Sequence, residues 1–173
     1  MVNYTLADGR RRVDVSLVRP DGFQVGEGPI TVSLAELVPD LIPDAMQQVN
    51  FADYTMGPSG SDTLTEKPLG TRGNVSVFTA SNFDANVTLL RSVTDGQPDD
   101  ADTLFAAIGE KGVTSYWYNR NYKLATIPLE VGDRGWVYEC TSDDPQEQGD
   151  EDGNIKTPIP LAVRNRREFI ITA

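Results

Sequence analysis

The stretch TASNFDANVTLLR, residues 79–91, passes from polar turn residues straight into a strand pattern. Ser81 to Asp84 are typical of a turn, whereas residues 86–93 alternate as a β-strand does. Neither face of that strand is cleanly polar, because Leu90 falls among polar residues and Arg91 among apolar ones. We predict that residues 75–80 pair with 86–93 across the turn. One face then meets the subunit's own core, and the other meets a partner or a narrow solvent space.

Beyond this strand, residues 98–112, PDDADTLFAAIGEKG, carry the clearest helical pattern. Asp99 or Asp100 is suited to cap the helix, and Asp102 in the first turn complements its dipole. The helix is expected to cover a sheet through an apolar stripe at spacings of three and four residues, formed by Leu104, Phe105 and Ile108.

Most of the remaining chain is predicted to be extended. The chain has 173 residues with 15 Gly and 11 Pro, which suits one domain with many turns and strands. We expect a mainly β fold: a two-sheet β-sandwich or partial barrel with one flanking α-helix over about 98–112 and long loops. Residues 1–28 are predicted to be an N-terminal arm or extension that contains a short strand, and residues 29–173 the β-sandwich domain.

Three segments carry more specific expectations. In residues 29–50, Pro39 and Pro43 interrupt an apolar run, which predicts two short helical turns or an irregular segment. Residues 51–74 are expected to form a long loop without secondary structure that orders on contact with a partner subunit. Residues 122–131 are expected to be extended, at an edge or bulge because of Pro128.

The composition excludes several kinds of chemistry. The formal charge is −11, which disfavours a protein that grips nucleic acid phosphates. There is no histidine, and the single Cys140 forms no pair, so a Ser-His-Asp triad and a His- or Cys-rich metal site are impossible within one chain. The chain has no nucleotide-binding or hydrolase motif. We expect no enzyme activity, no catalytic residue, no cofactor and no metal.

Three features leave two interpretations each. Cys140 is expected to be a buried packing residue rather than a nucleophile. The acidic loop 143–153 lacks the order of a calcium-binding loop, so we interpret it as solvated. The run Tyr116, Trp117 and Tyr118 could bind a ligand or stack on bases, but alternating aromatics in a strand more often form core and interface.

The order of these features resembles that of major tail proteins, the tail tube subunits of long-tailed bacteriophages, particularly of actinobacterial siphophages. The resemblance rests on VNFADYTMGPSGSDTLTEKPLG (49–70) followed by TASNFDANVTLLR. A Lys111-Gly112 step, a Gly132-Asp133 turn before an aromatic strand, an Asp144-Pro145-Gln146 loop and a closing PLAV at 160–163 follow in the same order.

The resemblance implies a structural virion protein of the phage tail, made in the host cytoplasm. It implies stacked hexameric rings whose strands merge into an inner barrel, through which DNA passes to the host without specific binding. Tape measure protein, tail terminator and baseplate proteins are the implied partners, and no membrane is involved. The strands around 75–93 and 135–172 are the expected lumen strands. The loop 51–74, the arm and residues 159–173 are expected to carry the contacts between rings and subunits.

The candidate residues for contact between subunits are Asp53, Tyr54, Ser61, Asp62, Thr63, Arg91, Arg164, Arg166 and Phe169. Two alternatives stay open at this point. The first is a tail terminator or head-tail joining protein, and the second is an immunoglobulin-like adhesive or carbohydrate-binding module that uses the aromatic run at 116–118.

Overall fold

The computed structural model describes residues 9–24, 28–66, 75–91, 93–94, 97–98, 102–146 and 155–173. Its elements are, in chain order, β1 (Arg12–Ser16), β2 (Ile30–Ser33), α1 (Leu34–Asp40), α2 (Ala45–Gln48), the 3-10 helix η1 (Phe51–Asp53), β3 (Thr55–Pro58), β4 (Thr63–Glu66), β5 (Val75–Phe78), β6 (Phe83–Leu90), β7 (Val93–Thr94), β8 (Gln97–Pro98), α3 (Thr103–Ile108), β9 (Thr114–Arg120), β10 (Arg134–Ser142) and β11 (Lys156–Thr172).

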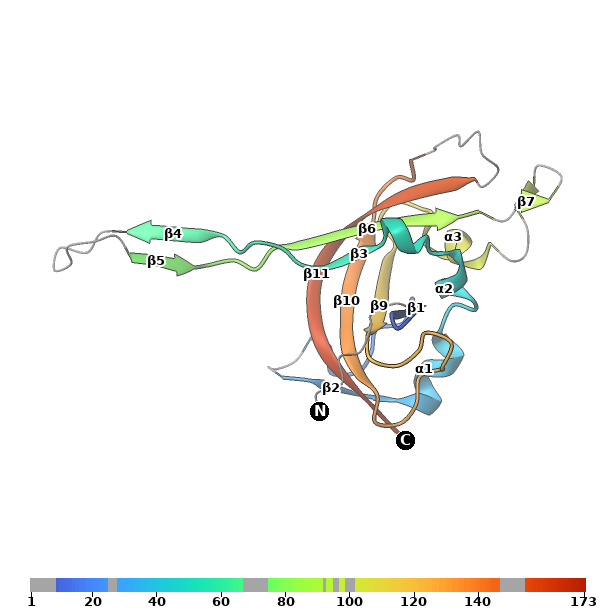
Figure 1. The fold of residues 1–173 in the computed structure, drawn as a ribbon, viewed down its shortest axis with the longest axis horizontal. Helices are drawn as coiled ribbons and strands as arrows, with labels where there is room; N and C mark the ends of the chain where they lie inside the picture. Colours follow the sequence, from blue (N-terminus) through green and yellow to red (C-terminus); the bar gives the residue numbers. More distant parts are fainter. Residues whose placement is uncertain are drawn as a thin grey trace, which may run out of the picture.

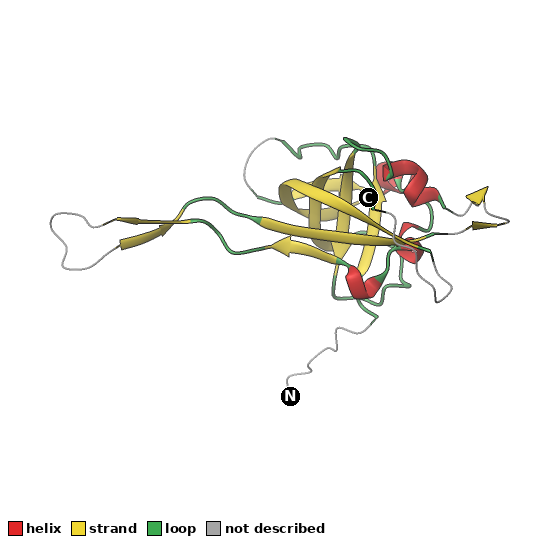
Figure 2. Ribbon diagram, turned by 90° about the horizontal axis from the view of Figure 1, so that it is seen from above, coloured by secondary structure: helices red, strands yellow, loops and turns green. Residues whose placement is uncertain are grey.

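The body is a strongly curved sheet with short helices on one side (Figures 1 and 2). Within the described residues its strand order is β1-β9-β10-β11-β6-β3, and β2 adds to β11 in parallel. The long strand β11 joins two sheets, because its first residues pair with β6 and its later residues pair with β10. The predicted mainly β fold with two sheets is confirmed.

Both faces of the sheet are buried around β9, which explains the aromatic run. Trp117 faces the core enclosed by β6, α2 and α3, whereas Tyr116 and Tyr118 face a second core under β2 and α1. Alternation along a strand sends neighbours to opposite faces, so all three rings are packing residues. Cys140 is also fully buried, as predicted.

The N-terminal segment is part of the main sheet. β1 pairs with β9 from Arg12 to Ser16, and Val13 and Val15 lie in the first core. The predicted short strand is therefore confirmed. The domain boundary at residue 28 stays a prediction.

The helical predictions are largely confirmed. Two short helices, α1 and α2, occupy the proline-interrupted segment, and Pro39 lies in the last turn of α1. The third helix, α3, spans only Thr103–Ile108, with Leu104 and Ile108 buried. Its N-cap is Asp102, whose side chain makes no capping hydrogen bond; Asp99 and Asp100 lie outside the described residues.

Two predictions about residues 51–93 were wrong: the pairing of 75–80 with 86–93 and the loop at 51–74. β5 pairs with β4 and not with β6, whose partners are β3 and β11. The reason is the backbone hydrogen bonding of residues 79–82. Ser59 N–H donates to Asn82 O (2.8 Å), and Thr79 N–H donates to Asp62 O (2.8 Å), so residues 79–82 continue a hairpin and do not turn back. It follows that the predicted structureless loop 51–74 contains η1, β3 and β4.

The extended segment predicted at 122–131 was also wrong. These residues form turns around the buried guanidinium of Arg120, at the end of β9. It donates to the carbonyl oxygens of Leu124 (2.9 Å), Ile127 (2.7 Å) and Pro128 (2.9 Å). Because these carbonyls bond to Arg120, this turn needs no strand partner.

Gly135 in β10 marks a close approach of three strands. A Cβ atom there would overlap the carbonyl oxygen of Asn119 and come within 2.9 Å of the Phe169 ring. We therefore expect Gly135→Ala to lower the free energy of unfolding by about 3 kcal/mol, since the backbone cannot give way. Urea denaturation followed by tryptophan fluorescence measures the change. Gly60→Ala is the control, because nothing lies within 4 Å of a Cβ there, and an equal loss in both variants would contradict the packing argument.

Candidate assembly surfaces

The β4–β5 hairpin projects away from the body (Figure 1). Its register pairs Leu64 with Val77 on one face and Thr63 with Phe78 on the other. These apolar side chains remain open to solvent: Leu64 is 52%, Val77 56% and Phe78 77% exposed. A two-stranded hairpin without a third strand or a packed face is marginally stable in water, so this hairpin lacks the burial that would hold it.

The base of the hairpin is fixed by polar contacts. The Asn82 amide donates to Gly60 O and to the Asp62 carboxylate, both at 3.0 Å. Ser61, Asp62 and Thr63 are all exposed here. The structure thus brings three of the predicted contact residues together at the root of a projecting arm.

A second surface lies along the middle of β11. β6 pairs with residues 156–160, and β2 pairs with 169–172. Between them, residues 161–168 pair only with β10 among the described strands. No described strand pairs with the other backbone edge of residues 161–166, and an unpaired edge is a template for a strand from another chain.

Arg164 is the extra residue of a β-bulge on this edge. Glu139 pairs with Asn165, and Cys140 pairs with Val163, so Arg164 has no partner opposite. A bulge reverses which alternate residues face the core. Consequently Val163 packs against the first core, whereas Phe169 lies in the second. The Arg164 side chain is exposed.

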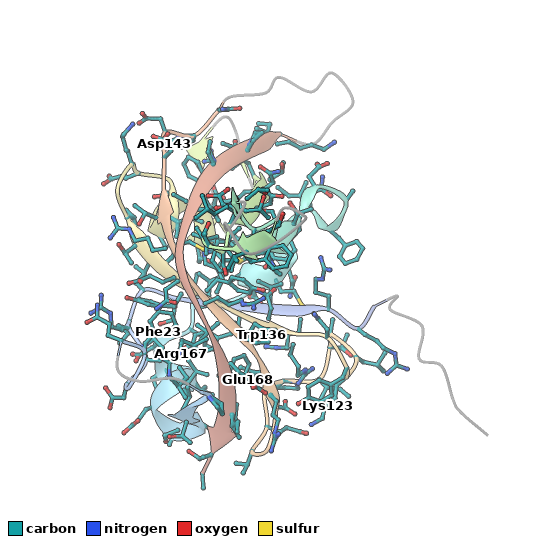
Figure 3. The ribbon with its side chains drawn as sticks, turned by 90° about the vertical axis from the view of Figure 1, so that its left-hand side faces the viewer. Phe23, Lys123, Trp136, Asp143, Arg167 and Glu168 are labelled. Atoms are coloured by element: carbon teal, nitrogen blue, oxygen red, sulfur yellow. The ribbon has the colours of Figure 1, made fainter. Side chains whose placement is uncertain are left out.

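Arg166 forms an aromatic stack beside the bulge. Its guanidinium carbon lies 4.0 Å from the Trp136 ring centre and 5.7 Å from that of Phe83. Glu168 pairs with Trp136 across β10 and β11, and the two side chains lie beside each other on the side facing the viewer in Figure 3. Trp136 is still 38% exposed, so a planar cationic and aromatic surface faces out of the subunit.

Arg91 binds within its own subunit. Its Nε donates to the Asp102 carboxylate (2.7 Å), and its guanidinium lies 3.4 Å from the centre of the Phe105 ring. Both groups belong to the start of α3 or its cap. Arg91 therefore fastens the end of β6 to α3.

Tyr54 and Phe169 are also interior. The Tyr54 hydroxyl donates to Asn119 Oδ1 (2.6 Å), and its ring stacks on Trp117 at 6.2 Å. Phe169 is fully buried, edge-on to Tyr118 at 5.4 Å. Asp53 is exposed and accepts from the Asn50 amide at 2.6 Å. A contact role for these residues and for Arg91 stays a prediction.

Sequence reasoning missed the most exposed apolar residues. Leu64, Val77 and Phe78 were read as loop or as a strand of the body, and Trp136 was not singled out. A signal was available: TLTE (63–66) and VSVF (75–78) both alternate and flank a Gly- and Pro-rich connection, which is a hairpin pattern.

The described part of the chain holds no group of three or more His, Cys, Asp or Glu side chains that could bind a metal ion. It also holds no helix long and apolar enough to cross a bilayer. Most of the acidic loop 143–153 lies outside the described residues; at its start, Lys111 pairs with Asp143 (2.6 Å) and Asp144 (3.1 Å).

An open strand edge, a projecting hairpin with exposed apolar residues and an exposed cation–aromatic stack define a subunit of a larger assembly. Comparison with known families makes this specific. Residues 1–168 match the model of the phage tail tube protein family, and the chain belongs to that family. It is thus a structural component of the phage tail.

A solved structure agrees at the level of the fold. The chain is similar to one in the cryo-EM structure of the anti-feeding prophage baseplate, 6-fold symmetrised, with a TM-score of 0.51 and 12% sequence identity over 96% of this chain and 97% of that chain. No curated protein sequence matches. The aromatic run that an adhesive or carbohydrate-binding module would need is buried in the core.

Proposed function

We propose that this subunit assembles into hexameric rings that stack into the tail tube, through which DNA passes to the host. The observation that carries the proposal is the projecting β4–β5 hairpin, whose Leu64, Val77 and Phe78 side chains are more than half exposed. Contact with the next ring would bury Leu64, Val77 and Phe78. Such burial stabilises by roughly 25 cal/mol per Å² of apolar surface.

The open edge of β11 supports closure of a ring. A strand of a neighbouring subunit that adds to residues 161–166 would pair with this edge and remove it. A barrel of many strands leaves an aqueous channel. The family and the six-fold symmetry of the similar baseplate assembly favour six subunits.

The charge of the subunit suits a conduit. With 26 acidic and 15 basic residues, an assembled wall repels phosphate and holds no DNA in transit. The tape measure protein inside the tube, and terminator and baseplate proteins at its ends, are the partners that follow from this role, with synthesis in the host cytoplasm.

Electron microscopy of the purified protein tests the proposal. We expect long hollow tubes, because contact with a further subunit would bury the exposed apolar side chains of the hairpin. Single rings that do not stack would favour a tail terminator instead. A monomer at all concentrations would contradict the proposal.

A further inference from the structure

A small pocket opens on the side of the body that carries α1. It has a volume of about 220 Å³ and lies between the turn after β1, β2 and α1. Asp21, Glu36 and Asp40 contribute carboxylates to its lining, and all three residues are exposed. Tyr118 also lines it, from the buried strand β9.

The Tyr118 hydroxyl is the unusual group in this pocket. The residue is only 1% exposed, yet its hydroxyl has no hydrogen-bond partner among the described residues. The neighbouring Tyr116 differs, because its hydroxyl accepts from Arg19 Nε (2.8 Å) and donates to Glu139 (3.1 Å). The Tyr118 hydroxyl opens onto the pocket and binds no described side chain, so it is available to a group that enters there.

The charge around the pocket indicates what that group is. None of Asp21, Glu36 and Asp40 forms an ion pair within the described part of the chain. Arg19, which also lines the pocket, is already bound to Tyr116 and Glu139. Burial, and then the nearby Asp40 carboxylate, raise the pKa of Tyr118, so its hydroxyl stays neutral. A guanidinium fits these surroundings, because its five N–H donors can bind the Tyr118 hydroxyl oxygen and more than one carboxylate at the same time.

Arg164 has the matching properties. Its side chain is exposed and makes no hydrogen bond or ion pair with the described residues. β11, which carries it, lies on the side from which the hairpin projects, whereas α1 lies on the opposite side (Figure 1). Complementary patches on opposite sides of one chain suit a head-to-tail contact, which is the kind of contact that a closed ring of identical subunits uses.

We propose that the acidic pocket beside α1 receives the guanidinium of Arg164 from a neighbouring copy of this chain. The inference rests on the proposed ring assembly and adds a specific lateral contact to it. A subunit with a charge of −11 repels its copies, and a basic side chain held in an acidic pocket offsets that repulsion at the point of contact.

Charge reversal tests the pairing. Asp40→Lys and Arg164→Glu are each expected to raise the critical concentration for assembly roughly tenfold or more, the loss typical of a desolvated charge pair with one partner removed. The double variant should recover most of the loss. The control is Glu110→Lys, the same charge change at an exposed acid outside the pocket, which should assemble at the wild-type concentration or lower.

Cross-linking provides a second measurement. Asp40→Cys and Arg164→Cys subunits, mixed and oxidised during assembly, should give disulfide dimers that neither variant gives alone; the native Cys140 is buried. If wild-type subunits form tubes, but the mixture gives no dimer and charge reversal has no effect, the pocket proposal is overturned. If wild-type subunits form no tubes at all, the proposed function fails instead.

Discussion

Replacement of residues 61–80 by Asn-Gly is expected to give a folded subunit that forms no tubes at any accessible concentration. The design uses the pairing at the hairpin root. Ser59 and Asn82 are hydrogen-bonded neighbours, so a two-residue turn between Gly60 and Ser81 preserves the register, and Asn-Gly is the preferred sequence for it. β3 and β6 are retained in full.

The loss of assembly follows from what is removed. Among the described side chains, Leu64, Val77 and Phe78 are the large exposed apolar residues of β4 and β5, and none belongs to either core. The fold should therefore survive, as circular dichroism and thermal unfolding will report. Pelleting at increasing protein concentration measures assembly.

A point variant separates the side chains from the backbone of the hairpin. Leu64→Thr with Val77→Thr retains strand propensity and removes the apolar pair on one face, so we expect assembly to weaken without being abolished. Normal tubes from the shortened subunit would show that the hairpin has no part in stacking.

Asp133→Asn is expected to destabilise the subunit by about 3–5 kcal/mol, the cost of leaving a buried cation without its partner. Asp133 and Arg120 are both almost fully buried, and Arg120 Nη1 donates to the Asp133 carboxylate at 2.7 Å. Tyr122 (2.9 Å) and Lys123 (2.6 Å) bind the same carboxylate. The pair holds together the turn that connects β9 to β10.

Glu130→Gln is the matched control. It makes the same change from carboxylate to amide in the same turn, but Glu130 pairs with Lys123 at the surface, where such a pair contributes about 0–1 kcal/mol. Urea denaturation at pH 7 compares the two, with the shortened hairpin as a monomeric background. Equal losses would contradict a specific role for the buried pair.

The same pair predicts an acid dependence. Burial alone would raise the pKa of Asp133, but hydrogen bonds from Lys123 and Arg120, then from Glu130 N–H and Tyr122, lower the pKa to about 2. The unfolded value is about 3.9. Because the folded pKa is the lower one, this stabilisation is complete above about pH 4 and is lost as the pH falls toward 2. The difference between wild type and Asp133→Asn should shrink over that interval.

Much of the fold could be predicted from periodicity, and the failures have local causes. The aromatic strand at 114–120 and the proline-interrupted helices follow from alternation and backbone chemistry. The pairing of β5 with β4 could not be found from neighbouring strands alone, since it depends on a hairpin that extends beyond the body. The turns at 121–133 depend on one buried arginine, Arg120, whose role becomes visible only when its partners are placed.

The contact residues divide in the same way. Ser61, Asp62 and Thr63 are exposed at the root of the hairpin, and their contact role stays a prediction. Tyr54 and Phe169 are interior. For Phe169 the cause is the bulge at Arg164, which shifts the alternation of β11, and no residue pattern indicates that shift. The acidic pocket beside α1 is lined by residues 21, 36, 40 and 118, which are far apart in the sequence and which only the fold brings together.

Cryo-electron microscopy of tubes formed by the purified protein would show both contacts at once. We expect six subunits in each ring, β11 at the joint between neighbours, and the β4–β5 hairpin buried against the adjacent ring. Tubes in which that hairpin points into solvent, or protein that forms no rings, would contradict this expectation.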